Sequence, residues 1–155
     1  MFNSQYGQDK FIYETFFKNK TDGIFLEIGA DDGVRFSNCK FFETELKWNG
    51  IAIEARESAY KKLQNNRTCT CVNAVLSDKK ETVEFLELEG YGTGLSGLVD
   101  KYDPSHVNRI SKEIKNPEHK GKKTITVQTV KLNEILDLYN VKKIDFLSID
   151  TEGSE

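Results

Sequence analysis

A short apolar run that ends in an acidic loop with glycines is the feature that most constrains the fold. Residues 24–28 follow an Asp-Gly turn signal and have the apolar character of a strand buried on both faces. The loop of residues 29–33, Gly-Ala-Asp-Asp-Gly, comes next, and a helix is expected to begin near Ser37, a good capping residue, with Phe41, Phe42 and Leu46 turned inward. A strand, a tight loop and a helix in this order open a parallel α/β unit.

The rest of the chain continues this alternation. Further strands are expected at residues 51–55, 68–75, 82–88, 124–130 and 144–150. Helices are expected within residues 6–17, after Ser58, before Asn116 and at residues 132–139. We therefore predict an α/β fold with a mostly parallel sheet and crossover connections, in a single domain of residues 1–155.

Charge and cysteine content narrow the function classes. The net charge of -3 argues against a nucleic-acid partner, and the basic run at residues 115–123 is interpreted as a solvated loop, with a patch for an anionic substrate as the less favoured alternative. No apolar run is long enough for a membrane span. The three cysteines, Cys39, Cys69 and Cys71, are odd in number and no secretory signal precedes them, so we expect reduced thiols and a cytoplasmic location.

Ligands of open α/β sheets bind beyond the carboxyl ends of the strands, where the strand order reverses. The expected strand ends carry Glu27-x-Gly29-x-x-x-Gly33, then Glu54, then Asn73-Ala74, and finally Asp150-Thr151-Glu152-Gly153. The glycines permit a sharp turn and close approach of a ligand. Their spacing is neither the dinucleotide pattern Gly-x-Gly-x-x-Gly nor a P-loop.

The charge of the first loop indicates the kind of ligand. Glu27, Asp31 and Asp32 would repel a pyrophosphate, whereas S-adenosylmethionine carries an ammonium and a sulfonium against one carboxylate. Glu54, 21 residues after Gly33, is suited to accept hydrogen bonds from both ribose hydroxyls. Each residue taken singly has a structural alternative, such as a Glu that only solubilises a strand end. Four suitable strand ends in the correct order favour a binding site.

These motifs resemble the FkbM-type methyltransferase family. The resemblance is carried by residues 4–9, 25–30, 37–38, 50–55, 73–74 and 144–153, in the order of the family. It implies a class I, Rossmann-like fold, S-adenosylmethionine as methyl donor, and O-methylation of a sugar or small natural product. The acceptor partner would then be a small molecule or a glycan.

Site residues are carried over by position. Glu27, Gly29, Ala30 and Gly33 would line the methionine moiety, and Glu54 would hold the ribose. Ala55, Asn73 and Ala74 would lie beside the adenine. Tyr6 and Gln8 would close over the cofactor, with a core aromatic as the alternative for Tyr6, and Asn38 would support the loop.

Catalysis requires a hydroxyl aligned with the methyl group and a group that removes its proton. Asp150 and Glu152 are the candidates, with Asp150 anchoring cofactor or substrate and Glu152 nearer the acceptor. A divalent cation on these oxygens ranks below a direct base, because no third ligand is identifiable. His106 and His119 lie in polar segments that we expect to be exposed. The glycine-rich residues 90–97 are interpreted as an acceptor loop or lid, or else a surface connection.

The chain differs from the family in length. It ends just after the fourth of the seven strands usual for this fold, so we expect a truncated sheet whose open edge permits self-association. Three hypotheses follow: an O-methyltransferase, a non-catalytic S-adenosylmethionine-binding module, and a nucleotide-binding oxidoreductase-like domain. The acidic loop and the missing Gly-x-Gly-x-x-Gly disfavour the third.

Overall fold

The computed structural model describes residues 1–151, which divide into two compact units. Unit 1 comprises Met1–Ala74 and Ile135–Asp150, and unit 2 is built on Val75–Glu134. Unit 2 is therefore inserted in the sequence of unit 1, between the third and fourth strands of its sheet.

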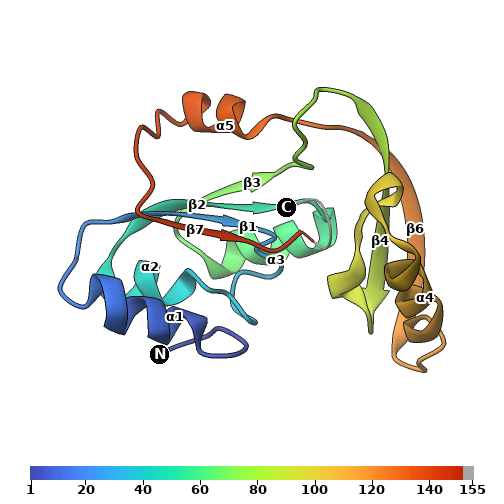
Figure 1. Ribbon diagram of the computed structural model, residues 1–155, viewed down its shortest axis with the longest axis horizontal. Helices are drawn as coiled ribbons and strands as arrows, with labels where there is room; N and C mark the ends of the chain where they lie inside the picture. Colours follow the sequence, from blue (N-terminus) through green and yellow to red (C-terminus); the bar gives the residue numbers. More distant parts are fainter. Residues whose placement is uncertain (152–155) are drawn as a thin grey trace. The chain divides into compact units, whose positions relative to one another are not determined.

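Unit 1 contains a four-stranded parallel sheet (Figure 1). Its strands are β1 (Ile24–Ile28), β2 (Asn49–Glu54), β3 (Thr70–Asn73) and β7 (Phe146–Ile149). The order is β3-β2-β1-β7, and every neighbouring pair is parallel. The chain moves from β1 outward to β3 and then returns to the other side of β1. The strand order thus reverses between β1 and β7, as the predicted binding site requires.

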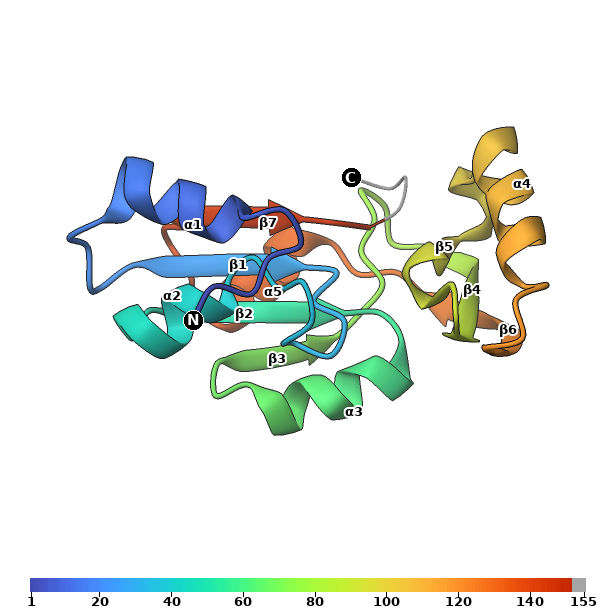
Figure 2. The same cartoon turned by 90° about the horizontal axis from the view of Figure 1, so that it is seen from below.

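Helices cover both faces of this sheet. They are α1 (Gln8–Ile12), which continues as a π-helical turn, α2 (Lys40–Leu46), α3 (Glu57–Asn66) and α5 (Leu132–Leu138). Figures 1 and 2 show α1, α2 and α3 on one face and the unit 1 part of α5 on the other. Ser58 was expected to cap a helix, but Arg56 holds the N-cap position of α3 and Ser58 lies in its first turn.

The core of unit 1 is aromatic where α2 packs on the sheet. Phe25 of β1 and Phe42 of α2 are fully buried, and Phe42 packs against Trp48 with ring centroids 4.9 Å apart. The Trp48 indole nitrogen donates a hydrogen bond of 2.9 Å to the Lys20 carbonyl. Beside α3, Leu63 packs against Ala52 of β2 and closes the same face. Burial of each large side chain contributes roughly 1.5–3 kcal/mol.

Unit 2 contains an antiparallel sheet. Its strands are β4 (Thr82–Gly90), β5 (Gly97–Leu98) and β6 (His119–Gln128), in the order β5-β4-β6, with α4 (Pro104–Glu113) between β5 and β6. The strands expected at residues 82–88 and 124–130 are present in β4 and β6, but they pair with each other in an antiparallel sheet and do not join the parallel one. Burial alternates along much of β6, as is typical of antiparallel strands with one solvated face.

Of the two loop expectations, one needs correction and the other remains a prediction. The basic run was interpreted as a solvated loop, but residues 119–123 belong to β6, where Lys123 pairs with Glu87. In the glycine-rich segment, Thr93–Leu95 forms a short 3-10 turn, and Leu95 is buried against Leu88 and Ile110. This segment is an ordered part of unit 2, and its predicted role as an acceptor loop stays a prediction.

Candidate functional site

The predicted strand ends meet at one edge of the unit 1 sheet. Ile28 pairs with Ile53 on one side and Ile149 on the other, and Glu54 pairs with Asn73. The Asp150 amide donates a hydrogen bond of 3.0 Å to the Ile28 carbonyl. The pairing of β7 with β1 therefore continues one residue beyond Ile149.

The loop after β1 is shaped by its glycines and by β2. The amides of Gly29 and Ala30 both donate to the Ile53 carbonyl, at 2.9 and 3.0 Å. Gly29 has a φ of 80°, and a Cβ there would overlap the carbonyl oxygen of Asp150. Gly33 also has a φ of 80°, and its position lies against α3. Only glycine meets both demands at residue 29, namely positive φ and close approach of β7.

Glu54 lies at the end of β2 with its carboxylate largely enclosed. Oε2 accepts a hydrogen bond of 2.8 Å from the Asp31 amide. Oε1 accepts from the Arg56 amide at 2.9 Å and from Arg56 Nε at 3.1 Å. The side chain is 6% exposed. Burial raises the pKa of Glu54 above its ordinary value, although Arg56 and the amide hydrogen bonds oppose this.

Arg56 joins Glu54 to the loop after β1. Its Nη2 forms an ion pair with Asp31, whose φ of 49° is unusual for a residue other than glycine. Asp32 has a local role, because its Oδ1 accepts from the Val34 and Arg35 amides. Sequence reasoning missed Arg56, which lies at the N-cap position of α3, two residues after the end of β2.

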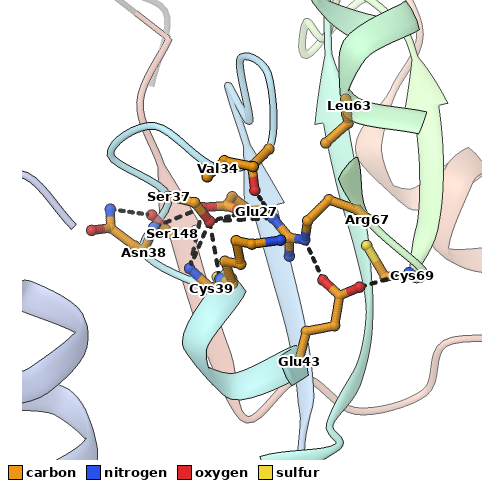
Figure 3. Close-up of polar contacts among 12 residues, drawn as sticks. Glu27, Val34, Ser37, Asn38, Cys39, Glu43, Leu63, Arg67, Cys69 and Ser148 are labelled. Atoms are coloured by element: carbon orange, nitrogen blue, oxygen red, sulfur yellow. Dashed lines mark hydrogen bonds and ion pairs between the residues drawn. The ribbon is translucent and has the colours of Figure 1, made fainter. Parts of the chain in front are cut away.

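Glu27 of β1 is enclosed on the face covered by α2 (Figure 3). Its Oε1 accepts from Ser37 Oγ and the Asn38 amide, both at 2.8 Å, and from the Cys39 amide at 3.2 Å. Its Oε2 accepts from Arg67 Nη1 at 2.8 Å. The Glu27 carboxylate thus fixes the backbone at the start of α2. The predicted negative charge of the loop after β1 also needs correction, because Arg56 and Arg67 neutralise carboxylates that the sequence analysis counted without their partners.

Arg67 has no exposed side-chain surface and joins three parts of unit 1. It pairs with Glu27 of β1 and Glu43 of α2, and it donates to the Gly33 carbonyl at 3.2 Å (Figure 3). Burial opposes ionisation of Glu43, but the charge and hydrogen bonds of Arg67 hold the pKa of Glu43 below its ordinary value. Ser37 Oγ accepts from the Lys40 amide, at the first residue of α2, at 3.0 Å, but Cys39 and not Ser37 holds the N-cap position of this helix. No sequence pattern distinguishes Arg67 from a surface arginine.

The two predicted asparagines connect the sheet strands to one another and to the segment before α2. Asn38 Nδ2 donates to Ser148 Oγ of β7 at 2.9 Å, while Asn38 Oδ1 is buried without a hydrogen-bond partner in the described structure. Asn73 Nδ2 donates to the carbonyls of Glu54 and Ala55, at 2.8 and 3.0 Å. The Ala74 amide donates to the Glu54 carbonyl at 3.3 Å. These contacts tie the end of β3 to the end of β2, and the segment before α2 to β7.

The N-terminal segment is tied to the loop after β1 through a bridge between Ser4 and Phe36. Tyr6 is 81% exposed, so the alternative of a core aromatic is wrong. Gln8 Oε1 accepts from the Tyr6 amide at 2.8 Å. Asp9, fully buried, accepts from the amide and hydroxyl of Ser4 at 3.1 and 2.6 Å, an anchoring role that sequence reasoning missed.

The predicted catalytic carboxylates lie at and beyond the end of β7. Asp150 is exposed there, and Glu152 lies outside the described residues. Within residues 1–151, no group of three or more His, Cys, Asp or Glu side chains is placed to hold a metal ion. His106 and His119 lie in unit 2 and are half-buried rather than exposed. In the same described range, no helix has the length and apolar character that crossing a membrane requires.

Comparison with known proteins identifies the family. The family model described as the methyltransferase FkbM domain matches residues 27–155. No curated protein and no solved structure matches the chain significantly. The matched range covers most of the 155 residues and includes the sheet edge with Glu27, Glu54 and Asp150. The chain therefore belongs to the FkbM methyltransferase family.

Proposed function

We propose that this protein binds S-adenosylmethionine at the carboxyl edge of the unit 1 sheet and methylates a hydroxyl of a sugar or small natural product. Family membership supports methyl transfer. The main support for this site is the reversal of strand order between β1 and β7, next to Glu54 at the end of β2. Because the family match runs through both units, we propose that residues 1–155 form one methyltransferase domain.

The groups at this edge suit S-adenosylmethionine better than a dinucleotide. Among residues 1–151, Asn38 Oδ1 is a buried acceptor with no hydrogen-bond partner, and such an atom favours a ligand that brings a donor. The ammonium of a methionine moiety is a donor, whereas the pyrophosphate of NAD offers only acceptors there. This argument replaces the one from loop charge, because Arg56 and Arg67 compensate the acidic side chains.

The proposed roles follow the strand ends. Gly29, Ala30 and Gly33 line the methionine moiety, and Glu27 acts by shaping that loop. Glu54 holds the ribose, while Ala55, Asn73 and Ala74 lie beside the adenine. Tyr6 and Gln8 close over the cofactor from the N-terminal segment.

Asp150 and Glu152 are proposed for the acceptor side of the reaction. The bound cofactor supplies an electrophilic methyl group on a sulfonium, so the protein must orient the acceptor hydroxyl and take its proton. We propose Asp150 as an anchor at the end of β7 and Glu152 as the proton acceptor. A Glu152→Gln variant should slow turnover and leave cofactor affinity unchanged. Equal turnover would remove Glu152 from this role.

The test of the cofactor assignment is calorimetric titration of the protein with S-adenosylmethionine, S-adenosylhomocysteine and NAD. We expect saturable binding of the first two and none of NAD. Binding of NAD alone would overturn the proposal in favour of an oxidoreductase-like domain. Cofactor binding without turnover on any hydroxyl acceptor would instead support a non-catalytic S-adenosylmethionine-binding module.

A further inference from the structure

Arg56 lies between two carboxylates at the proposed ribose position. Its Nε and its own amide donate to Glu54 Oε1 at 3.1 and 2.9 Å, and its Nη2 pairs with Asp31. The Arg56 side chain is 9% exposed, so this guanidinium is a built part of the sheet edge rather than a solvated surface cation. Glu54 and Asp31 come from different segments, the end of β2 and the loop after β1.

We propose that Arg56 is a positioning residue for cofactor binding, which fixes the Glu54 carboxylate and fastens the loop after β1 to the end of β2. This inference rests on the proposed function, since it concerns the same ribose site. Arg56 acts through Glu54 and Asp31 and is not assigned a contact with the cofactor.

The hydrogen bonds restrict how Glu54 can turn. Oε1 is held by two donors of Arg56 and Oε2 by the Asp31 amide, so the carboxylate plane has one orientation. A carboxylate offers about four acceptor positions. Within the described residues three are used, which leaves one on Oε2 for a single ribose hydroxyl rather than for the two expected from the sequence. A carboxylate held in one orientation loses less freedom when it binds than one that rotates.

The same contacts hold the loop. Asp31 adopts a left-handed backbone conformation, which is unfavourable for a residue with a Cβ. In this conformation its amide donates to Glu54 while its carboxylate pairs with Arg56. A strained residue persists where surrounding contacts determine its conformation. Arg56 and Glu54 together supply those contacts, so loss of Arg56 should release the loop as well as the carboxylate.

Charge gives the role a signature that packing alone would not produce. The charged groups that face Glu54 in these contacts are Arg56, from its own strand end, and Asp31, from the loop after β1. The amide of neighbouring Asn73 on β3 is uncharged and bonds to the Glu54 carbonyl. Burial raises the pKa of Glu54, Arg56 lowers it, and Asp31 raises it. Removal of Arg56 should therefore favour protonation of Glu54, and removal of the Asp31 charge should oppose it.

The experiment measures the affinity for S-adenosylhomocysteine by calorimetry at several values between about pH 5 and pH 8, where carboxyls with raised pKa values titrate. The variants are Arg56→Gln, Arg56→Lys and Asp31→Asn. Lys61→Gln is the matched control, since it removes one positive charge from an exposed pair with Glu57 in α3. Binding needs no turnover, so no acceptor has to be known.

We expect Arg56→Gln to weaken binding about tenfold at neutral pH, a typical effect of losing a charged hydrogen bond. As the pH is lowered, the affinity of this variant for S-adenosylhomocysteine should begin to fall at a higher pH than that of the wild type. In Asp31→Asn this fall should begin at a lower pH, Arg56→Lys should restore part of the affinity, and Lys61→Gln should match the wild type. If Arg56→Gln does not fold, the opposite shift in Asp31→Asn still tests the charge relationship.

Two results would overturn the inference in distinguishable ways. Normal binding by the wild type, with an unshifted profile in Arg56→Gln and Asp31→Asn, would overturn the role of Arg56 alone. Absence of S-adenosylhomocysteine binding by the folded wild type at every pH would overturn the proposed function and the positioning role with it.

Discussion

Replacement of Arg67 by Met should destabilise unit 1 by about 3–5 kcal/mol, the usual cost of removing one partner from a buried ion pair. The magnitude follows from the contacts. Arg67 is fully buried and serves two carboxylates, those of Glu27 and Glu43, and its stem packs beside Gly33. Met retains much of the apolar stem, so the change removes charge and hydrogen bonds more than volume. For a protein of this size the loss corresponds to a fall in Tm of about 6–20 °C.

The pH dependence of this loss separates electrostatics from packing. In the wild type the pKa of Glu43 is lowered in the folded state, so its stabilising contribution is present above the unfolded pKa and disappears as pH falls through the folded value. In Arg67→Met the buried Glu43 carboxylate lacks its cation, and burial then raises its pKa. The variant then gains stability when protons bind, so its deficit should be smaller at about pH 5 than at about pH 7.

Urea unfolding followed by tryptophan fluorescence is the appropriate assay, because the single tryptophan, Trp48, is buried in the core of unit 1. Lys61→Met is the control, since Lys61 pairs with Glu57 at the surface of α3 and should change stability little. A deficit under about 1 kcal/mol, or one equal at both pH values, would refute the reasoning that Arg67 stabilises unit 1 through charge.

Three further predictions concern the loop after β1, the ribose acid and the thiols. Gly29→Ala should lower Tm and abolish S-adenosylhomocysteine binding. Gly7 has the same φ of 80° but open space around it, so Gly7→Ala should lower the free energy of unfolding by only about 1–2 kcal/mol. Equal Tm shifts in the two variants would contradict the clash of residue 29 with β7. Glu54→Gln should weaken S-adenosylhomocysteine binding by about 10- to 150-fold in calorimetry, and an unchanged Kd would remove it from the ribose site. Alkylation mapped by mass spectrometry should modify Cys71 before Cys39. Burial raises the pKa of both thiols, and Cys39 is the more deeply buried, with a pKa well above its ordinary value. Earlier labelling of Cys39 would contradict this prediction.

Local patterns predicted the parallel sheet of unit 1 and the position of its edge. The apolar runs at residues 24–28 and 51–55 correspond to β1 and β2, and Phe41 and Phe42 face the core as expected. These features depend on nearest neighbours in sequence, such as a strand followed by a glycine turn. Glu54 was found for the same reason, since the end of a strand determines where its last side chain lies.

Contacts between distant segments were beyond local patterns. Arg67 pairs with Glu27 across 40 positions, and nothing in the neighbourhood of either residue indicates the other. The antiparallel pairing of β4 with β6 was also missed. There the alternation of apolar and polar residues at 124–127 was a usable signal, because a strand of a fully covered parallel sheet is more continuously apolar.

The insertion of unit 2 between β3 and β7 has a consequence for the order of folding. The Ile24 amide bonds to the Asp145 carboxylate at the start of β7 across 121 positions, whereas β1 and β2 pair through residues much nearer in sequence, such as Ile24 and Asn49. Lengthening a loop adds only about 0.6 kcal/mol of closure free energy for each doubling, but distant pairings slow folding. We expect a kinetic intermediate in which β3, β2 and β1 are assembled and the edge of β1 is open. Until β7 pairs with β1, the unpaired backbone groups of β1 can form hydrogen bonds with other chains and promote aggregation. Since the proposed cofactor site includes the end of β7, a ligand would stabilise only the fully assembled sheet and could not template the earlier steps.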